Sequence, residues 1–265
     1  MEHSKILNDI PIELKKGIIK SIQDAIGDDI ILDRKNNELD THNGDPNRIW
    51  DFINRNLEKN LESEDYIVRT TKRGRWEMKF IVDKRSGILY TLMREERFNS
   101  LKKEVPKRKT IHYIQAIADT FNTGLKAREQ QLSLFKEQNY YSEDAIKKIV
   151  DKVLTDLLTP KNIISNHVIV LFQGKSHELE SVRCCIINGD LGIVEEESWN
   201  EYIEMHESVV MHEVKEANEQ ANNPTLGLRY KQKAKDKIGQ TNNSEYKKEK
   251  KKKYVDMNNT KDETD

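Results

Sequence analysis

The stretch YIVRTTKRGRWEMKFIVDKRSGILYTLM, residues 66–93, decides the fold. Apolar and polar residues alternate through RWEMKFIVD, which places Trp76, Met78, Phe80 and Val82 on one face of a strand. The short breaks KRG and DKRSG separate three such runs, and turns of this length force neighbouring strands to pair antiparallel. We therefore expect a three-stranded antiparallel meander, with its polar face open to solvent.

A second meander follows the same pattern near the other end of the chain. The runs HVIVLFQ, ELESVRCCIIN and LGIVEE are separated by the turn signals GKS and NGD. Whether the two meanders share one sheet is left open by the sequence.

Helical patterns precede and follow each meander. A stripe of isoleucines from Ile12 to Ile26 predicts a first helix that stops at Gly27, and Pro46 predicts the start of a second helix with Asp45 as its N-cap. Residues 110–136 predict one or two helices, residues 142–158 predict the best-defined helix, with Ser142 or Asp144 as cap, and a last helix should follow Ser198. The fold class is therefore α+β, two short antiparallel meanders flanked by helices.

Composition divides the chain into a body and a tail. Residues 1–216 should form the α+β body, either whole or as two sub-domains, 1–105 and 106–216. Residues 217–265 have few large apolar residues and predict a disordered, Lys-rich tail. Residues 229–254 contain eleven Lys or Arg and three Asp or Glu, so the formal net charge of −1 for the whole chain conceals a basic tail on an acidic body.

The two cysteines are adjacent, and so they should point to opposite faces of a strand rather than form a disulfide. This usage fits a reducing compartment. Neither a signal peptide nor an apolar run long enough for a membrane span is present in the sequence. We expect a cytoplasmic protein without a membrane partner.

One spacing is typical of metal-dependent nucleases. Asp65 precedes Glu77-Met78-Lys79 by an interval found in the PD-(D/E)XK group, where two carboxylates hold Mg²⁺ and a lysine orients the attacking water. Against this interpretation, Glu64 replaces the usual Pro, and the strand with Glu77 turns back into another strand instead of leading into a helix. An ordinary charged strand face explains the spacing better, so we expect no catalytic residue, no metal and no cofactor, with Mg²⁺ required only under the nuclease alternative.

Other catalytic signatures are missing from the sequence. GxxxxGK[ST], GxGxxG and GxSxG do not occur, and the seven histidines show no metal-ligand spacing.

Two basic segments predict contact with nucleic acid. The tail carries a cluster of lysines: Lys247, Lys248, Lys250, Lys251, Lys252 and Lys253. A second basic stretch, residues 102–109, ends in Lys107, Arg108 and Lys109. Such polycations gain affinity for phosphate backbones through counterion release.

Three stretches resemble a family of uncharacterised bacterial proteins: RWEMKFIVDKRSGILYTLMREERF, HYIQAIADTFN and HVIVLFQGKSHELESVRCCIINGDLGIVEEESWNEYI. The resemblance covers residues 5–210, leaves the tail outside, and implies an origin in low-GC Gram-positive bacteria and their mobile elements. It implies no substrate and no site residues.

Three functions follow as hypotheses. The first is a non-enzymatic protein that contacts nucleic acid through the tail and residues 102–109, in regulation or phage-related conflict. The second is an adaptor whose acidic body binds a protein partner. The third is the Mg²⁺-dependent nuclease with Asp65, Glu77 and Lys79 as its site.

Overall fold

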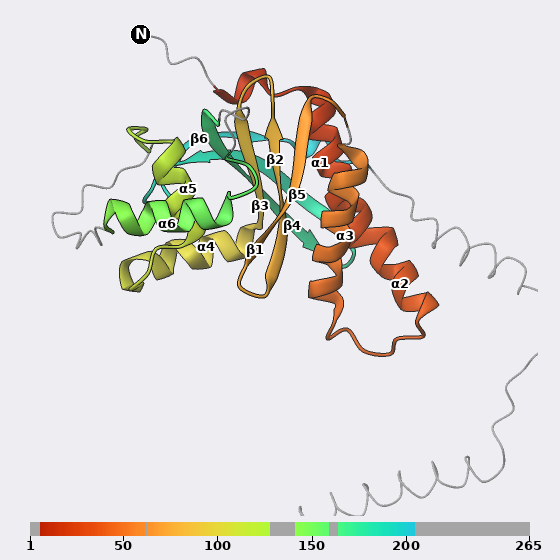
Figure 1. Cartoon of the computed structure of the whole chain (residues 1–265). Coiled ribbons are helices and arrows are strands. Elements are labelled where there is room, and N and C mark those ends of the chain that lie inside the picture. Colours follow the sequence, from red (N-terminus) through yellow and green to blue (C-terminus); the bar gives the residue numbers. More distant parts are fainter. Residues whose placement is uncertain (1–5, 62, 128–140, 159–163, 205–265) are drawn as a thin grey trace, which may run out of the picture. The chain divides into compact units, whose positions relative to one another are not determined.

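The computed structural model describes residues 6–61, 63–127, 141–158 and 164–204 (Figure 1). The chain divides into two compact units, Met1–Glu213 and Val214–Asp265, and every described residue belongs to the first. The predicted tail, 217–265, lies outside the described residues.

A six-stranded sheet with the strand order β1-β2-β3-β4-β5-β6 forms the centre of the body. Its strands are β1 (Tyr66–Arg73), β2 (Trp76–Asp83), β3 (Ile88–Arg94), β4 (Asn166–Lys175), β5 (Glu178–Ile187) and β6 (Ile193–Ser198). Both predicted meanders are present, and all their internal pairings are antiparallel. The sequence analysis is confirmed on this point.

The two meanders are joined by one parallel pair. β3 runs beside β4 in register from Ile88 opposite Asn166 to Arg94 opposite Phe172. The two halves of the body therefore share a single sheet, and the alternative division at residues 105 and 106 does not correspond to separate sheets.

Helices cover both faces of this sheet (Figure 1). One face carries α1 (Ile12–Asp24), a π-helical turn η2 (Ala25–Asp29) and α3 (Asp45–Asn60), with α2 (Ile30–Asn36) following the turn. The other face carries α4 (Glu95–Glu104), α5 (Tyr113–Phe121) and α6 (Glu143–Val153). Short 3-10 turns lie at η1 (Ile6–Asp9), η3 (Val105–Lys107) and η4 (Asn200–Tyr202). The expectation of a solvated face on the first meander is therefore wrong.

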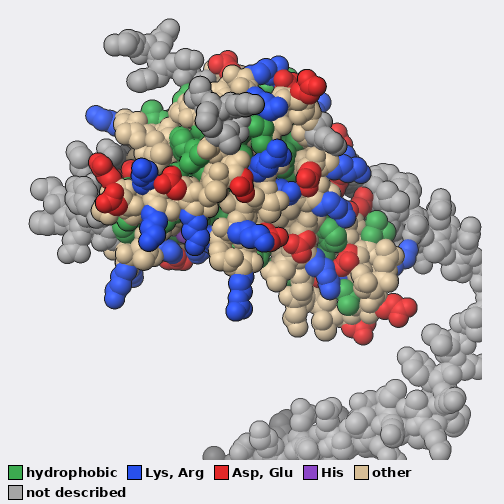
Figure 2. Space-filling view, viewed as in Figure 1, with side chains coloured by type: hydrophobic (Ala, Val, Ile, Leu, Met, Phe, Trp, Pro, Cys, Tyr) green, Lys and Arg blue, Asp and Glu red, His purple; other side chains and the backbone are tan. Residues whose placement is uncertain are grey.

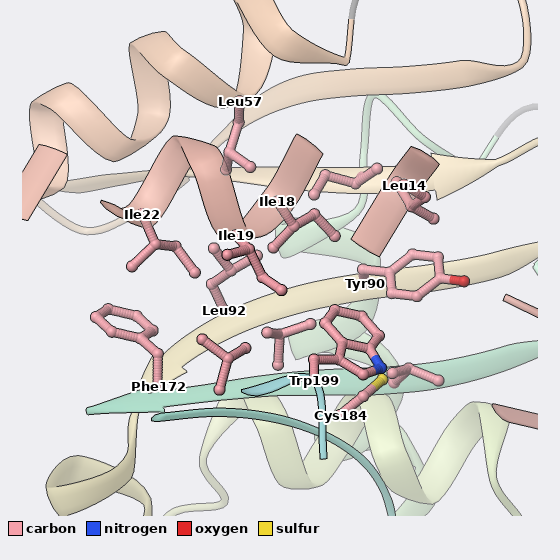
Figure 3. Close-up of a cluster of buried hydrophobic side chains, with 14 of the residues drawn as sticks. Leu14, Ile18, Ile19, Ile22, Leu57, Tyr90, Leu92, Phe172, Cys184 and Trp199 are labelled. Carbon is pink, nitrogen blue, oxygen red and sulfur yellow. The ribbon is translucent and has the colours of Figure 1, made fainter. Parts of the chain in front are cut away.

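Two hydrophobic cores result, one on each side of the sheet. Figure 3 shows the first, where Ile18, Ile19 and Ile22 of α1 pack above Tyr90 and Phe172 of the sheet. The second core contains Phe98 and Leu101 of α4, a helix that the sequence analysis did not predict.

The adjacent cysteines divide between the cores, as predicted. Cys184 lies in the first core and Cys185 in the second, and both are free and buried. Burial raises the pKa of the Cys185 thiol to about 12 and that of Cys184 well above its ordinary value. Neither thiol is a nucleophile at neutral pH.

Several predicted helix ends are wrong. The first helix does not stop at Gly27, because the chain continues through η2 into α2. Gly27 instead lies close to the carbonyl oxygen of His177, which a Cβ atom would approach to 3.4 Å. Gly44, not Asp45, occupies the N-cap of α3, whereas Ser142 caps α6 as predicted by accepting from the Ala145 N–H at 3.3 Å. The last predicted helix falls on η4 and on residues outside the described part.

Candidate nucleic-acid interface

The structure separates the three residues of the predicted nuclease site. Tyr66 pairs with Asp83 and Lys72 pairs with Glu77, so Asp65 and Glu77 lie at opposite ends of the β1–β2 hairpin. At the rise of a β-strand, the seven steps from position 65 to position 72 span about 23 Å. Two carboxylates at this separation cannot share one metal ion.

Each of the three residues has a partner of its own. Asp65 lies 3.3 Å from Arg85, Glu77 lies 2.6 Å from Lys72, and the Lys79 ammonium lies 2.9 Å from Glu58. The hydrogen bond from Lys72 holds the pKa of the Glu77 carboxyl below its usual range. Across the described ranges, no three His, Cys, Asp or Glu side chains are close enough to hold a metal ion.

The strand that does lead into a helix is β3, which is followed directly by α4. Its residues before Arg94 are Ile88, Leu89, Tyr90, Thr91, Leu92 and Met93. None of these residues is an Asp, Glu or Lys. The strand position where such nucleases carry their ExK residues therefore has no charged side chain in this protein.

The β1–β2 turn is instead the centre of a basic surface. Strand pairing is regular up to Arg73 opposite Trp76, leaving the two-residue turn Gly74-Arg75. Gly74 has a φ of +64°, and Arg75 has a negative φ, as in a type II′ turn with glycine first. A Cβ on Gly74 would meet nothing within 4 Å, so the tip of the hairpin is open.

Arg73 attaches this tip to the start of α5. Its Nη1 lies 2.9 Å from Nε2 of His112, and its guanidinium lies 5.0 Å from the ring centre of Tyr113. The hydroxyl of Thr71 donates to the Val153 carbonyl at the end of α6 across 2.5 Å. Among the described residues, no carboxylate lies within ion-pair distance of Arg73.

Two further arginines lie on α4 and directly after η3. Arg97 and Arg108 both pair with Glu104, at 2.8 Å and 2.9 Å. The pKa of His112 is lowered to about 3. Burial is the largest cause, and the positive charges of Arg73, Arg108 and Arg97 add to it. Of the three arginines, Arg73 contacts the ring directly, whereas Arg97 and Arg108 act on its pKa through their charge.

His112 is held by its place as the N-cap of α5. Its Nδ1 accepts from the Ile114 N–H at 3.3 Å, and Gln115 completes a capping box. Both ring nitrogens therefore face N–H donors, an arrangement that disfavours the imidazolium, which has no acceptor.

We define the basic surface by seven residues. They are Lys72, Arg73 and Arg75 of the hairpin tip, Arg97 of α4, and Lys107, Arg108 and Lys109 after it. Figure 2 shows Lys and Arg side chains standing out along this side of the molecule, over α4 and the β1–β2 turn.

The sequence analysis found part of this surface. Lys107 and Lys109 are exposed, and Arg108 is half-buried against Glu104. Lys72, Arg73, Arg75 and Arg97 were missed, although the run KRGR across a tight turn was a visible signal. The predicted tail contacts, Lys247, Lys248 and Lys250–Lys253, lie outside the described residues.

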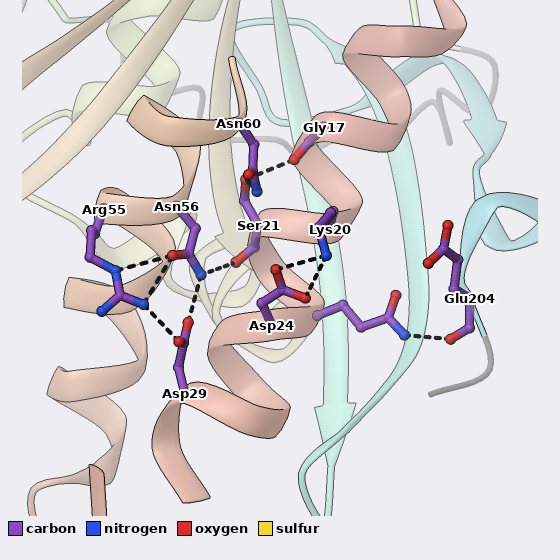
Figure 4. A network of polar contacts seen from close by, with 10 residues as sticks. Gly17, Lys20, Ser21, Asp24, Asp29, Arg55, Asn56, Asn60 and Glu204 are labelled. Atoms are coloured by element: carbon purple, nitrogen blue, oxygen red, sulfur yellow. Dashed lines mark hydrogen bonds and ion pairs between the residues drawn. The ribbon is translucent and has the colours of Figure 1, made fainter. Parts of the chain in front are cut away.

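A second polar cluster, between α1, η2 and α3, has a structural explanation (Figure 4). Asp29 pairs with Arg55 at 2.7 Å and accepts from the Asn56 amide at 2.7 Å, while Asn60 donates to the Ser21 hydroxyl at 3.0 Å. Charges and hydrogen bonds are matched within this cluster, which fixes the π-helical turn against α3.

Comparison with protein families places most of the chain in a described family. Residues 7–251 match a family described as a family of unknown function (DUF5986). The chain belongs to the DUF5986 family. This agrees with the resemblance to an uncharacterised family, but the DUF5986 match extends past residue 210 to residue 251, and so the expectation that the tail lies outside is wrong.

No curated protein and no solved structure matches this DUF5986 chain. Within the described ranges, none of its helices is both long and apolar enough to cross a membrane.

Proposed function

We propose that this DUF5986 protein binds nucleic acid through its phosphates and performs no chemistry on it. The observation that supports this proposal is a group of arginines from separate segments: Arg73 contacts His112 at 2.9 Å, and Arg97 and Arg108 share the Glu104 carboxylate. Guanidinium groups are planar, permanently charged and weakly hydrated, which suits them to bind phosphate through paired hydrogen bonds.

Protection of a sheet edge is the competing explanation. β1 is an edge strand, and Lys or Arg on an edge discourages pairing with another chain. That explanation applies to Lys72 and Arg73, but it does not account for Arg97, Arg108 and their neighbours, which lie on and after α4 rather than on a strand. Phosphate binding accounts for both groups.

The tail supplies a second set of contacts in this proposal. Its lysines from Lys247 to Lys251 fall within the family match, so this part of the tail belongs to the sequence shared by the family. Residues 1–228 carry a net charge of −6, which repels a polyanion from most of the body and leaves the basic surface and the tail as its contact points. We assign the activity to the bacterial cytoplasm, in regulation or phage-related conflict.

A mobility-shift titration of the full-length protein tests the proposal. Labelled DNA and RNA are titrated at about 50 mM and about 200 mM salt, with Mg²⁺ and with EDTA. We expect a shift that weakens steeply with salt and is the same with EDTA. The triple variant Arg75→Ala/Lys107→Ala/Lys109→Ala should reduce the slope of log K against log salt by about 2 to 3.

The matched control is Lys16→Ala/Lys20→Ala/Lys59→Ala. It removes the same charge from exposed positions on α1 and α3, which cover the opposite face of the sheet. An equal loss in both variants, or binding that ignores salt, overturns the proposal. Metal-dependent cleavage would instead support the nuclease alternative, and a stoichiometric protein partner without nucleic-acid binding would support the adaptor.

A further inference from the structure

We infer that the ligand is B-form double-stranded DNA and that the β1–β2 hairpin tip enters its major groove. This inference rests on the proposed function and names the form of nucleic acid that the basic surface fits. Four observations carry it: the shape of the tip, its rigid attachment, the flanking cations and the absence of an exposed aromatic ring among the described residues.

The tip is a two-residue turn at the end of a paired hairpin. β1 and β2 stay paired to the last residues before the turn, so the tip is a two-stranded ribbon. The major groove of B-DNA, about 12 Å wide, admits such a ribbon. Lys72 exposes 71% of its side chain, Arg75 is exposed, and the space around Gly74 is open. Arg75 is exposed and makes no hydrogen bond or ion pair with the described residues, so its guanidinium can donate to the acceptor edge of guanine, the commonest partner of arginine in this groove.

The base of the ribbon is held on both sides. Arg73 contacts His112 and Tyr113, and Thr71 bonds to the end of α6. Trp76, the first residue of β2, packs edge-on against Trp50 of α3, with ring centres 6.2 Å apart. The tip is thus ordered before it meets a ligand, which lowers the entropic cost of binding.

Cations beside the tip fit the phosphates that border a groove. Lys107 and Lys109 are exposed on either side of Arg108, in the segment that leads directly into His112, and Arg73 next to the tip contacts His112 at 2.9 Å. Contacts with phosphates position a protein on a duplex, whereas contacts between the tip and the base edges recognise the sequence.

The described aromatic side chains do not offer a platform for single strands. Binding of unpaired bases relies on exposed aromatic rings for stacking. Within the described ranges, the exposed large apolar side chains are Ile12, Leu32 and Leu158, and none of them is aromatic. The deep, narrow major groove of A-form RNA excludes side chains, so duplex RNA does not fit the tip either.

The test compares one sequence as about 20 base pairs of duplex DNA, as duplex RNA and as single-stranded DNA, with full-length protein at one salt concentration. Duplex DNA should bind at least about tenfold more tightly than the other two. Methylation of guanine N7, which lies in the major groove, should reduce that binding, and a minor-groove ligand should leave it unchanged.

Two variants distinguish the contacts of the tip with base edges from the contacts of the flanking lysines with phosphates. Arg75→Ala should remove most of the preference for duplex DNA, and Lys107→Ala should weaken all three ligands alike. Equal or tighter binding of single strands or duplex RNA, or indifference to N7 methylation, overturns the groove inference while the proposed function stands. Absence of salt-sensitive binding to every ligand overturns both.

Discussion

Asn122 and His167 are joined by a pair of opposed hydrogen bonds. The Asn122 amide donates to the His167 carbonyl at 2.8 Å, and its oxygen accepts from the His167 N–H at 2.9 Å. The same amide nitrogen donates to the Ile187 carbonyl at 2.8 Å. One buried side chain at the end of α5 thereby satisfies the backbone of two neighbouring strands, β4 and β5.

Removal of this side chain should be costly. Asn122→Ala leaves three buried backbone groups without their partner, and we expect a loss of about 2 to 4 kcal/mol in the free energy of unfolding. Urea denaturation followed by tryptophan fluorescence measures it. Asn99→Ala, which removes an exposed contact with Glu95 on α4, should cost less than about 0.5 kcal/mol, and equal losses in the two variants would contradict this account.

Stability should fall as the pH is lowered below neutrality. Burial lowers the pKa of both His112 and His167 to about 3, whereas an unfolded histidine titrates near 6.5. Between these values the unfolded chain binds more protons than the folded one, so stability present above pH 6.5 is lost as the pH falls towards 3. From pH 7.5 to 5.5 the expected loss is about 1.4 kcal/mol for each histidine.

A single substitution checks the assignment of this pH dependence. His112→Asn keeps a residue suited to an N-cap and removes one of the two titrating rings, so the loss between pH 7.5 and 5.5 should fall by about half. An unchanged pH dependence would assign the effect to other groups.

Glu197 has a structural role that its neighbour Glu196 lacks. It accepts from the buried Lys15 ammonium at 2.7 Å and from the Trp199 indole N–H at 2.9 Å. Glu197→Ala leaves the buried Lys15 ammonium without its carboxylate partner and should lower the free energy of unfolding by about 2 to 4 kcal/mol. Adding Lys15→Met should recover part of that loss, and Glu196→Ala should cost less than about 1 kcal/mol, because Arg183 keeps its two bonds to Glu95.

Glu77 should be dispensable. Glu77→Ala removes an exposed ion pair with Lys72, and we expect no measurable change in the free energy of unfolding, because solvent screens such a pair. Incubation with DNA and Mg²⁺ should give the same result for this variant as for the unmodified protein. If the unmodified protein cleaves DNA in a metal-dependent way and Glu77→Ala does not, the rejection of the nuclease site would be falsified.

The strands could be predicted because their determinants are local. Gly74 and Gly87 adopt a positive φ at the turns of the first meander, and the alternation between Trp76 and Val82 needs no distant information. α4 was missed because only Phe98 and Leu101 of its ten residues are buried, which is too sparse a stripe to recognise among charges.

Contacts between distant segments could not be predicted. Gly27 resembled a helix stop because the sequence does not show that the β4–β5 turn, with His177, packs against it. Likewise, the position of Arg73 beside His112 depends on the packing of β1 against α5, so the basic surface was found only in its continuous part, Lys107 to Lys109.

The parallel pairing of β3 with β4 sets an order for folding. Each hairpin closes a loop of a few residues, which takes microseconds in isolated peptides, whereas the β3–β4 pair closes a loop of about 70 residues at a higher entropic cost. The two meanders should therefore form early and separately, and their union should complete the native sheet. Until then β3 and β4 each present an unpaired, apolar edge, which makes this late step the one at which a nascent chain is most exposed to aggregation.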